Sequence, residues 1–282
     1  MIKVEAEYRI LHRIADRLAP DMKQAFLEAV RALRAKIDHT QLQVLLARGD
    51  QGDLGAFWQA FEQEVGPTLR QPISDATLRA GQRTGNALGM AFDITNPRAR
   101  QAIDRQSLTL IHDITQESRA TIRAILREGF NGGIDVPEMA RRIRGSIGLN
   151  ERGATAVENF RRAQLEQGID PDVVEERALS YAQRLLRQRA TNIARTETIA
   201  AANQGQQAAW EEAQAQGYLG AAMRTWITTP DDRLCEEICA PMDGQVRGIN
   251  EPFTTGEGDL VMLPPAHPSC RCAVGLAVPE EA

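Results

Sequence analysis

The chain has 282 residues with a formal net charge of −5, and 43% of them are hydrophobic, which argues against a disordered chain. No run approaches the roughly 18 consecutive apolar residues of a membrane-spanning helix, so we expect no membrane segment. Residues 205–282 hold twelve acidic side chains against four Arg, a balance that permits contact with DNA but differs from a dedicated nucleic-acid-binding domain.

The first third of the chain follows a helical pattern. Apolar residues recur at helical spacing over residues 8–18, and Pro20 predicts a break after them. A second helix is expected beyond this break, with Phe26, Val30 and Leu33 directed inward.

Helical spacing continues through the centre of the chain with one ambiguous stretch. Residues 41–55 fit no single pattern, and helical spacing resumes in two stretches between residues 57 and 92. Asn96-Pro97 marks a break. One long amphipathic helix is then expected over residues 102–128, with the glycine-rich segment 129–133 as its stop signal.

The next helices have recognisable first residues. Asp135, followed by Glu three positions later, forms a capping pattern, and Asn150 is a second N-cap. Asp170 precedes a proline that fits the first helical turn. One more helix is expected over residues 189–215.

The pattern changes at Tyr218, where Gly and Pro become frequent. Short extended runs over residues 223–229, 245–247 and 271–278 indicate strands. We therefore expect an α+β fold, with a mainly helical body and a small C-terminal β-containing module. A module of this size buries little apolar surface and needs an additional stabilising link, such as a bound metal ion or disulfides. The expected division is 1–96, a helical region without an assigned role; 97–217, a second helical part; and 218–282, the Cys-rich module.

All four cysteines lie in this last module, at Cys235, Cys239, Cys270 and Cys272. Thiolates and imidazole are favoured zinc ligands, and His267 lies one turn before Cys270. Five candidates compete for four positions, so either Cys272 or His267 can lie outside the set of direct ligands. Disulfides and free thiols are the alternatives; the N-terminus lacks a signal peptide, so cytoplasmic synthesis argues against disulfides.

The sequence favours a structural zinc ion over a catalytic one. The motifs of zinc deaminases and of metalloproteases are missing from the chain. Glu236 and Glu237, between the first two cysteines, are interpreted as a solvated turn. A site with three or four thiolates is closed and structural.

Two polar groups of the helical body are further candidates. Asn192, Arg195 and Asn203 fall on one helical face that suits docking against the zinc module, with a solvated face as the alternative. The best basic patch suits phosphate, again with a solvated face as the alternative. It consists of Arg141, Arg142, Arg144, Arg161 and Arg162.

The chain also resembles the phage Mu F-like family of minor head proteins, the phage head-morphogenesis domain, over residues 100–278. The residues that carry the resemblance are Ile193-Ala194-Arg195-Thr196-Glu197, Asn203, Gly205, Trp226, Asp231 or Asp232 with Arg233, Cys235, Cys239, Gly244, Phe253, and Pro264-Pro265-x-His267-Pro268-x-Cys270-Arg271-Cys272.

The resemblance implies a low-copy virion protein, present in the host cytoplasm during assembly and then in the phage head. Its implied partners are the portal protein, the major capsid protein, or both, and it admits contact with packaged double-stranded DNA. We expect a structural role, with no enzymatic activity, no small-molecule substrate and no membrane partner. The alternative is a zinc-dependent hydrolase or nuclease carried in the virion, which an open metal position near a carboxylate would favour.

Overall fold

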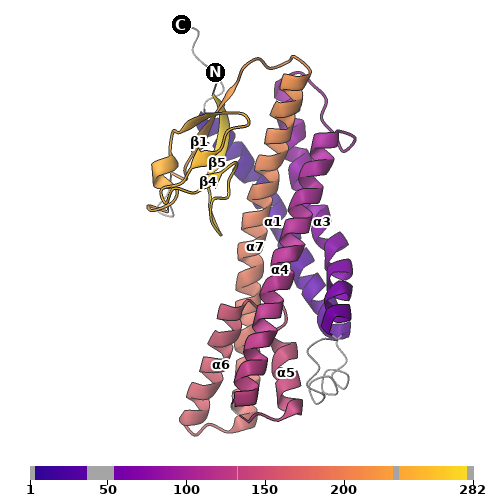
Figure 1. Cartoon of the computed structure of the whole chain (residues 1–282), viewed down its shortest axis with the longest axis vertical. Helices are drawn as coiled ribbons and strands as arrows, with labels where there is room; N and C mark the ends of the chain where they lie inside the picture. Colours follow the sequence, from indigo (N-terminus) through magenta and orange to yellow (C-terminus); the bar gives the residue numbers. More distant parts are fainter. Residues whose placement is uncertain (1–3, 37–53, 132, 231–234, 278–282) are drawn as a thin grey trace. The chain divides into compact units, whose positions relative to one another are not determined.

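In the described part of the chain, most residues as far as Ala215 lie in helices, and short strands follow. The computed structural model describes residues 4–36, 54–131, 133–230 and 235–277. In this part of the chain the α-helices are α1 (Val4–Lys36), α3 (Leu54–Ala87), α4 (Pro97–Asn131), α5 (Val136–Ser146), α6 (Glu151–Glu166) and α7 (Pro171–Ala215). The strands are β1 (Met223–Ile227), β2 (Val246–Gly248), β3 (Phe253–Thr254), β4 (Leu260–Val261) and β5 (Ala273–Ala277), with a 3-10 helix at Ala240–Met242 (Figure 1). The predicted mainly helical α+β fold is confirmed.

The helix starts follow the predicted capping residues. The side chain of Asp135 accepts a hydrogen bond from the backbone N–H of Glu138 at 2.8 Å, and that of Asn150 accepts one from Gly153 at 3.0 Å. Asp170 likewise accepts from the N–H of Asp172 at 3.0 Å. Each cap satisfies a backbone donor that has no partner inside its helix.

Two predicted helix boundaries are wrong. Helix α1 continues through Pro20, because the buried Leu18 and Met22 on either side hold the helix against its core despite the lost backbone hydrogen bond. The two helices expected on either side of residue 189 form the single helix α7, which has buried residues Leu186 and Ala190 across the expected junction. Most of the ambiguous segment 41–55 lies outside the described residues.

The chain forms two compact units, each assembled from separate stretches. Unit 1 contains residues 1–23, 70–107 and 191–282, and unit 2 contains residues 24–69 and 108–190. Helices α1, α3, α4 and α7 each contribute residues to both units. Whether residues 1–96, 97–217 and 218–282 fold as three independent domains stays a prediction.

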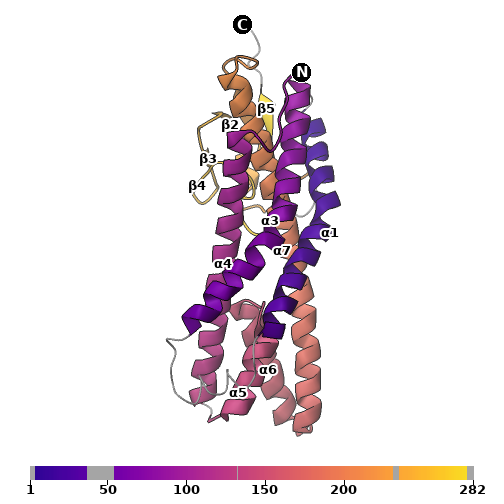
Figure 2. The same cartoon turned by 90° about the vertical axis from the view of Figure 1, so that its right-hand side faces the viewer.

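Unit 2 is helical. In it α5 and α6 lie beside the C-terminal part of α4 (Figures 1 and 2). The inward direction predicted for Phe26, Val30 and Leu33 is confirmed, since all three are buried. Arg34 donates to the carbonyl oxygens of Gly145 and Ile147 at 3.0 and 2.8 Å, which satisfies acceptors at the end of α5.

Unit 1 holds the strands, which lie beside the C-terminal part of α7 (Figure 1). One antiparallel sheet has the order β2-β1-β5, with Trp226 opposite Val274, and β3 pairs with β4 in a second sheet. The three predicted strands are confirmed to within two residues at each end. Strands β3 and β4 were not predicted, because two residues are too few to show an alternating pattern.

Candidate metal centre

The first cysteine pair lies on a single tight turn. The backbone N–H groups of Cys239 and Ala240 donate to the carbonyl oxygen of Cys235 at 3.0 and 2.9 Å, so the chain closes one helical turn between the two cysteines. The N–H of Gly256 donates to the carbonyl oxygen of Ile238 at 3.1 Å. A Cβ on Gly256 would lie 1.8 Å from the carbonyl oxygen of Glu237, so only glycine allows this approach.

The second cysteine pair lies on a loop that leads into β5. The N–H of Cys270 donates to the carbonyl oxygen of His267 at 3.0 Å, and Ser269 has a positive φ of 63°. The N–H of Cys272 points to the Sγ of Cys270 at 3.5 Å. This turn directs the side chains of Cys270 and Cys272 toward Cys239.

Three thiols therefore meet in the interior. The Sγ atoms of Cys239, Cys270 and Cys272 all lie within 4.8 Å of one another, and each residue is 1% exposed. The sulfurs of Cys239 and Cys270 are 3.8 Å apart. Four sulfurs held about 2.3 Å from a tetrahedral zinc ion lie roughly 3.8 Å from each other, so the donor set and its spacing fit such an ion.

The thiols also influence one another's protonation. Hydrogen bonding from Cys239 lowers the pKa of Cys270, and the same contact raises the pKa of Cys239 to about 12. Hydrogen bonding to Cys239, with burial, raises the pKa of Cys272. These contacts thus favour a thiolate at Cys270 over one at Cys239 or Cys272. Further deprotonation becomes favourable when a cation is bound between the sulfurs.

The two remaining metal-ligand candidates are less buried than the three clustered thiols. Cys235 is half-buried and packs against the apolar cluster that contains Trp226 and Phe253, and all four cysteines are free thiols. His267 is half-buried, and its Nδ1 lies 2.9 Å from the carbonyl oxygen of Pro268. Glu236 and Glu237 are exposed, as the solvated-turn interpretation requires. Residues 231–234, which precede Cys235, lie outside the described part of the chain.

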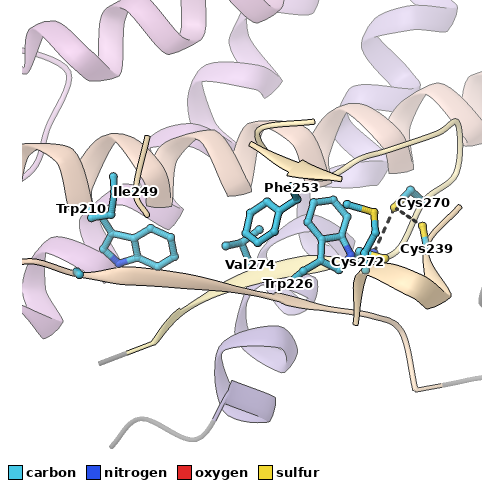
Figure 3. Close-up of a cluster of buried hydrophobic side chains, with 10 residues drawn as sticks. Trp210, Trp226, Cys239, Ile249, Phe253, Cys270, Cys272 and Val274 are labelled. Atoms are coloured by element: carbon cyan, nitrogen blue, oxygen red, sulfur yellow. Dashed lines mark hydrogen bonds between the residues drawn. The ribbon is translucent and has the colours of Figure 1, made fainter. Parts of the chain in front are cut away.

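An apolar core supports the thiols. Figure 3 shows the three sulfurs at one end of a cluster that extends past Trp226 and Phe253 to Trp210 on α7. The rings of Trp226 and Phe253 meet edge to face, with centroids 5.2 Å apart. Aromatic pairs in this geometry stabilise the fold beyond the area they bury.

Arg224 is a residue of this module that the sequence interpretation missed. It lies on β1 two positions before Trp226, on the inward-facing side of the strand, and it is 0% exposed. Burial lowers its pKa to about 10, which still leaves the guanidinium charged at neutral pH. The alternation of buried and less buried residues along β1, which places Arg224 on the same side as Trp226, was the signal that could have identified it. Its acceptors are the carbonyl oxygens of Gly248 (3.2 Å), Met262 (2.9 Å) and Glu251, and the Oε1 of Gln207 on α7 (3.2 Å).

The predicted docking face of α7 divides into two parts. Asn203 is buried, and its Oδ1 accepts a hydrogen bond from the N–H of Val274 on β5 at 3.3 Å. Asn192 and Arg195 are exposed. Thr196, which was not singled out as a docking residue, accepts from the N–H of Ser269 at 3.0 Å. A docking role for the whole face stays a prediction.

The predicted basic patch lies in unit 2, where three of its residues pair with carboxylates. Arg161 is 4% exposed and binds Glu158 and Glu175, and Arg142 binds Glu158 at 2.8 Å. The charges of Arg142 and Arg161 are thus balanced inside the unit. Arg141, Arg144 and Arg162 are exposed, although Arg141 also pairs with Glu138 at 2.8 Å.

Comparison with known proteins gives one match. Residues 120–275 match the family described as Phage Mu protein F like protein, a stretch that includes α5, α6, α7 and all four cysteines. No curated protein and no solved structure matches the chain. In the described part of the chain, none of the helices combines the length and apolarity required to cross a membrane.

Proposed function

Because the chain belongs to the Phage Mu protein F like family, we propose that it is a structural minor head protein of a tailed bacteriophage. The family implies a role in head morphogenesis. The proposed location is the portal and the capsid interior, first in the infected host cytoplasm and then in the virion. The proposed partners are the portal protein, the major capsid protein, or both.

The observation that carries a structural role is the closed thiol group. Cys239, Cys270 and Cys272 are buried, and their spacing fits a tetrahedral zinc ion. In this proposal Cys235 or His267 supplies the fourth ligand. Zinc bound by three or four protein ligands of this kind supplies folding free energy, on the order of 10 kcal/mol in small zinc domains.

Contact with packaged DNA is a further part of this proposal. It rests on Arg141, Arg144 and Arg162, whose side chains are exposed, whereas Arg161 is buried and Arg142 is half-buried. Arginine guanidinium groups suit phosphate oxygens. A gel shift that weakens as salt concentration rises is expected for the purified protein. Binding that is unchanged when these three arginines are replaced by Gln would contradict the assignment.

The metal is tested on the purified full chain. We expect about one zinc ion per wild-type chain, and loss of zinc together with protease sensitivity of residues 218–277 in Cys239→Ser. Ala221→Ser adds a hydroxyl at an exposed position of the same module and is the matched control. A Cys239→Ser chain that stays as protease-resistant as the control would show that the thiol group does not hold the module.

The head role is tested in infected cells. Purified heads are expected to contain the wild-type chain and the Ala221→Ser chain, and to be depleted of Cys239→Ser. The measurement is an immunoblot of heads separated on a density gradient. A protein missing from wild-type heads would contradict the head role. A chain that hydrolyses DNA or peptidoglycan, with loss of turnover in Glu236→Gln or Glu237→Gln, would favour the zinc-dependent hydrolase or nuclease instead.

A further inference from the structure

The N-terminal helix contacts the second cysteine turn directly. The Nε2 of His12 on α1 lies 2.8 Å from the carbonyl oxygen of Arg271, the residue between Cys270 and Cys272. A carbonyl oxygen only accepts hydrogen bonds, so His12 is the donor. His12 precedes the family match, which begins at residue 120.

The surroundings of His12 hold its ring in place. The ring of Tyr8 lies against it, with centroids 4.2 Å apart. His12 also lines a small hollow together with Leu11 and Cys272. The imidazole is therefore held between its own helix and the loop that carries two of the three thiols.

Helix α1 is attached to β5 at a second point as well. The Oε2 of Glu7 accepts hydrogen bonds from the N–H of Leu276 at 3.2 Å and from the Nε2 of Gln206 at 3.1 Å. Leu11 and Ala273 share a buried apolar cluster between these two polar contacts. The loop and the strand that follow Cys270 are thus fixed from one side by α1.

We propose that His12 is a positioning residue for the thiol site, and that its hydrogen bond to Arg271 slows release of the metal. The proposal rests on the proposed zinc site. His12 is assigned a supporting role because its Nε2 donates to the peptide unit between two of the clustered thiols. Its hydrogen bond restricts rotation of the peptide unit between two ligands, and outer contacts of this kind commonly change metal affinity by about 10- to 100-fold.

The test compares four variants of the full chain. His12→Ala removes the donor, and His12→Gln retains an N–H group in a similar place. Ile14→Ala loosens the packing of α1 against the apolar cluster that contains Ala80 and Ala273, but it leaves the His12 donor in place. His112→Ala replaces an exposed histidine of α4 and is the control for the loss of a histidine side chain as such.

Two rates are measured for each variant: transfer of zinc to a chromogenic chelator, and alkylation of Cys272 in the metal-free chain, followed by mass spectrometry. We expect His12→Ala to release zinc about 10-fold faster than wild type and His12→Gln to restore part of this difference. Alkylation of Cys272 is expected to rise in His12→Ala and to stay unchanged in His112→Ala.

The outcomes separate this proposal from the zinc site itself. Zinc release from His12→Ala at the wild-type rate, or an equal acceleration in Ile14→Ala, would overturn the positioning role. If the wild-type chain binds no zinc, the metal part of the proposed function fails. The alkylation rates then decide whether His12 fixes the turn, and equal rates in wild type and His12→Ala would overturn that claim too.

Discussion

At the scale of single residues, Arg224 connects several separate segments of the cysteine module with one another and with α7. Its guanidinium donates to three backbone carbonyl oxygens and to Gln207 on α7, and it stacks on Phe253 at 5.0 Å. A buried charge without these acceptors would be strongly unfavourable. The planar fork of arginine satisfies them together, which a lysine ammonium cannot do.

Replacing this side chain tests its contribution. Arg224→Met keeps the length but removes every donor, and we expect the free energy of unfolding to fall by on the order of 3 kcal/mol because buried carbonyl oxygens lose their partners. Arg247→Met, on the neighbouring β2, is the control, with an expected change within about 0.5 kcal/mol. Urea unfolding followed by the fluorescence of Trp210 and Trp226, which lie in the same cluster, measures both. Equal effects of the two changes would contradict this role.

Glu7 predicts a pH dependence of stability. Burial raises its pKa above 4.5, against the lowering effect of the hydrogen bond from Leu276. A carboxyl with a raised folded-state pKa favours the protonated form, so its contribution to stability is present at low pH and is lost as pH rises through that pKa. Glu7→Gln should therefore gain stability relative to wild type between pH 4.5 and neutral pH. A pH-independent difference, or the same trend in the exposed control Glu28→Gln, would refute this account.

At the scale of secondary-structure elements, α3 and α7 approach each other at a glycine. A Cβ on Gly205 would lie 1.9 Å from the carbonyl oxygen of Thr77, which is a backbone atom and cannot rotate away. Small residues on both helices allow this approach, among them the buried Ala80 and Ala202. The close contact fixes the part of α7 in unit 1 between Asn203 and Gln207, two residues that support the cysteine module.

Gly205→Ala is accordingly expected to destabilise the chain even though alanine favours helices. The clash should lower the free energy of unfolding by roughly 1–3 kcal/mol, the usual range for overpacked cores. Gly220→Ala is the matched control, because a Cβ there meets no atom within 4 Å and its backbone needs no positive φ. Thermal unfolding of both variants is the measurement. A Gly205→Ala chain as stable as wild type would show that the two helices are not packed this closely.

At the scale of the whole molecule, unit 1 is built from three separate stretches of the chain. The cysteine module shares its core with Trp210 of α7, and backbone N–H groups of its β5 strand donate hydrogen bonds to the side-chain oxygens of Asn203 and Glu7. These contacts come from residues outside 218–282. Zinc binding by the cysteines therefore cannot substitute for the stabilising contacts that these residues make with the module.

This arrangement predicts how fragments behave. A fragment of residues 218–282 is expected to stay unfolded with added zinc, because the α1 and α7 surfaces that complete its core are missing. The full chain in the same buffer is the control. Amide proton dispersion in a two-dimensional NMR spectrum is the measurement. A well-dispersed spectrum of the zinc-loaded fragment would instead support an independent domain at 218–282.

The sequence alone determined the features that depend on neighbouring residues. The caps Asp135, Asn150 and Asp170 form hydrogen bonds within three residues of themselves, so their helix starts were predictable. The clustering of all cysteines in one short module likewise indicated a common site, and the family resemblance rests on the same local motifs.

Tertiary structure decided what depends on distant partners. Arg161 belongs to the predicted basic patch, yet its charge is balanced by Glu158 and by Glu175 on another helix. His12 fits an ordinary helix position, and only folding brings it to Arg271, 259 residues further along the chain. Helical and strand periodicities identify which side of an element is buried, but they carry no information about which distant element covers it.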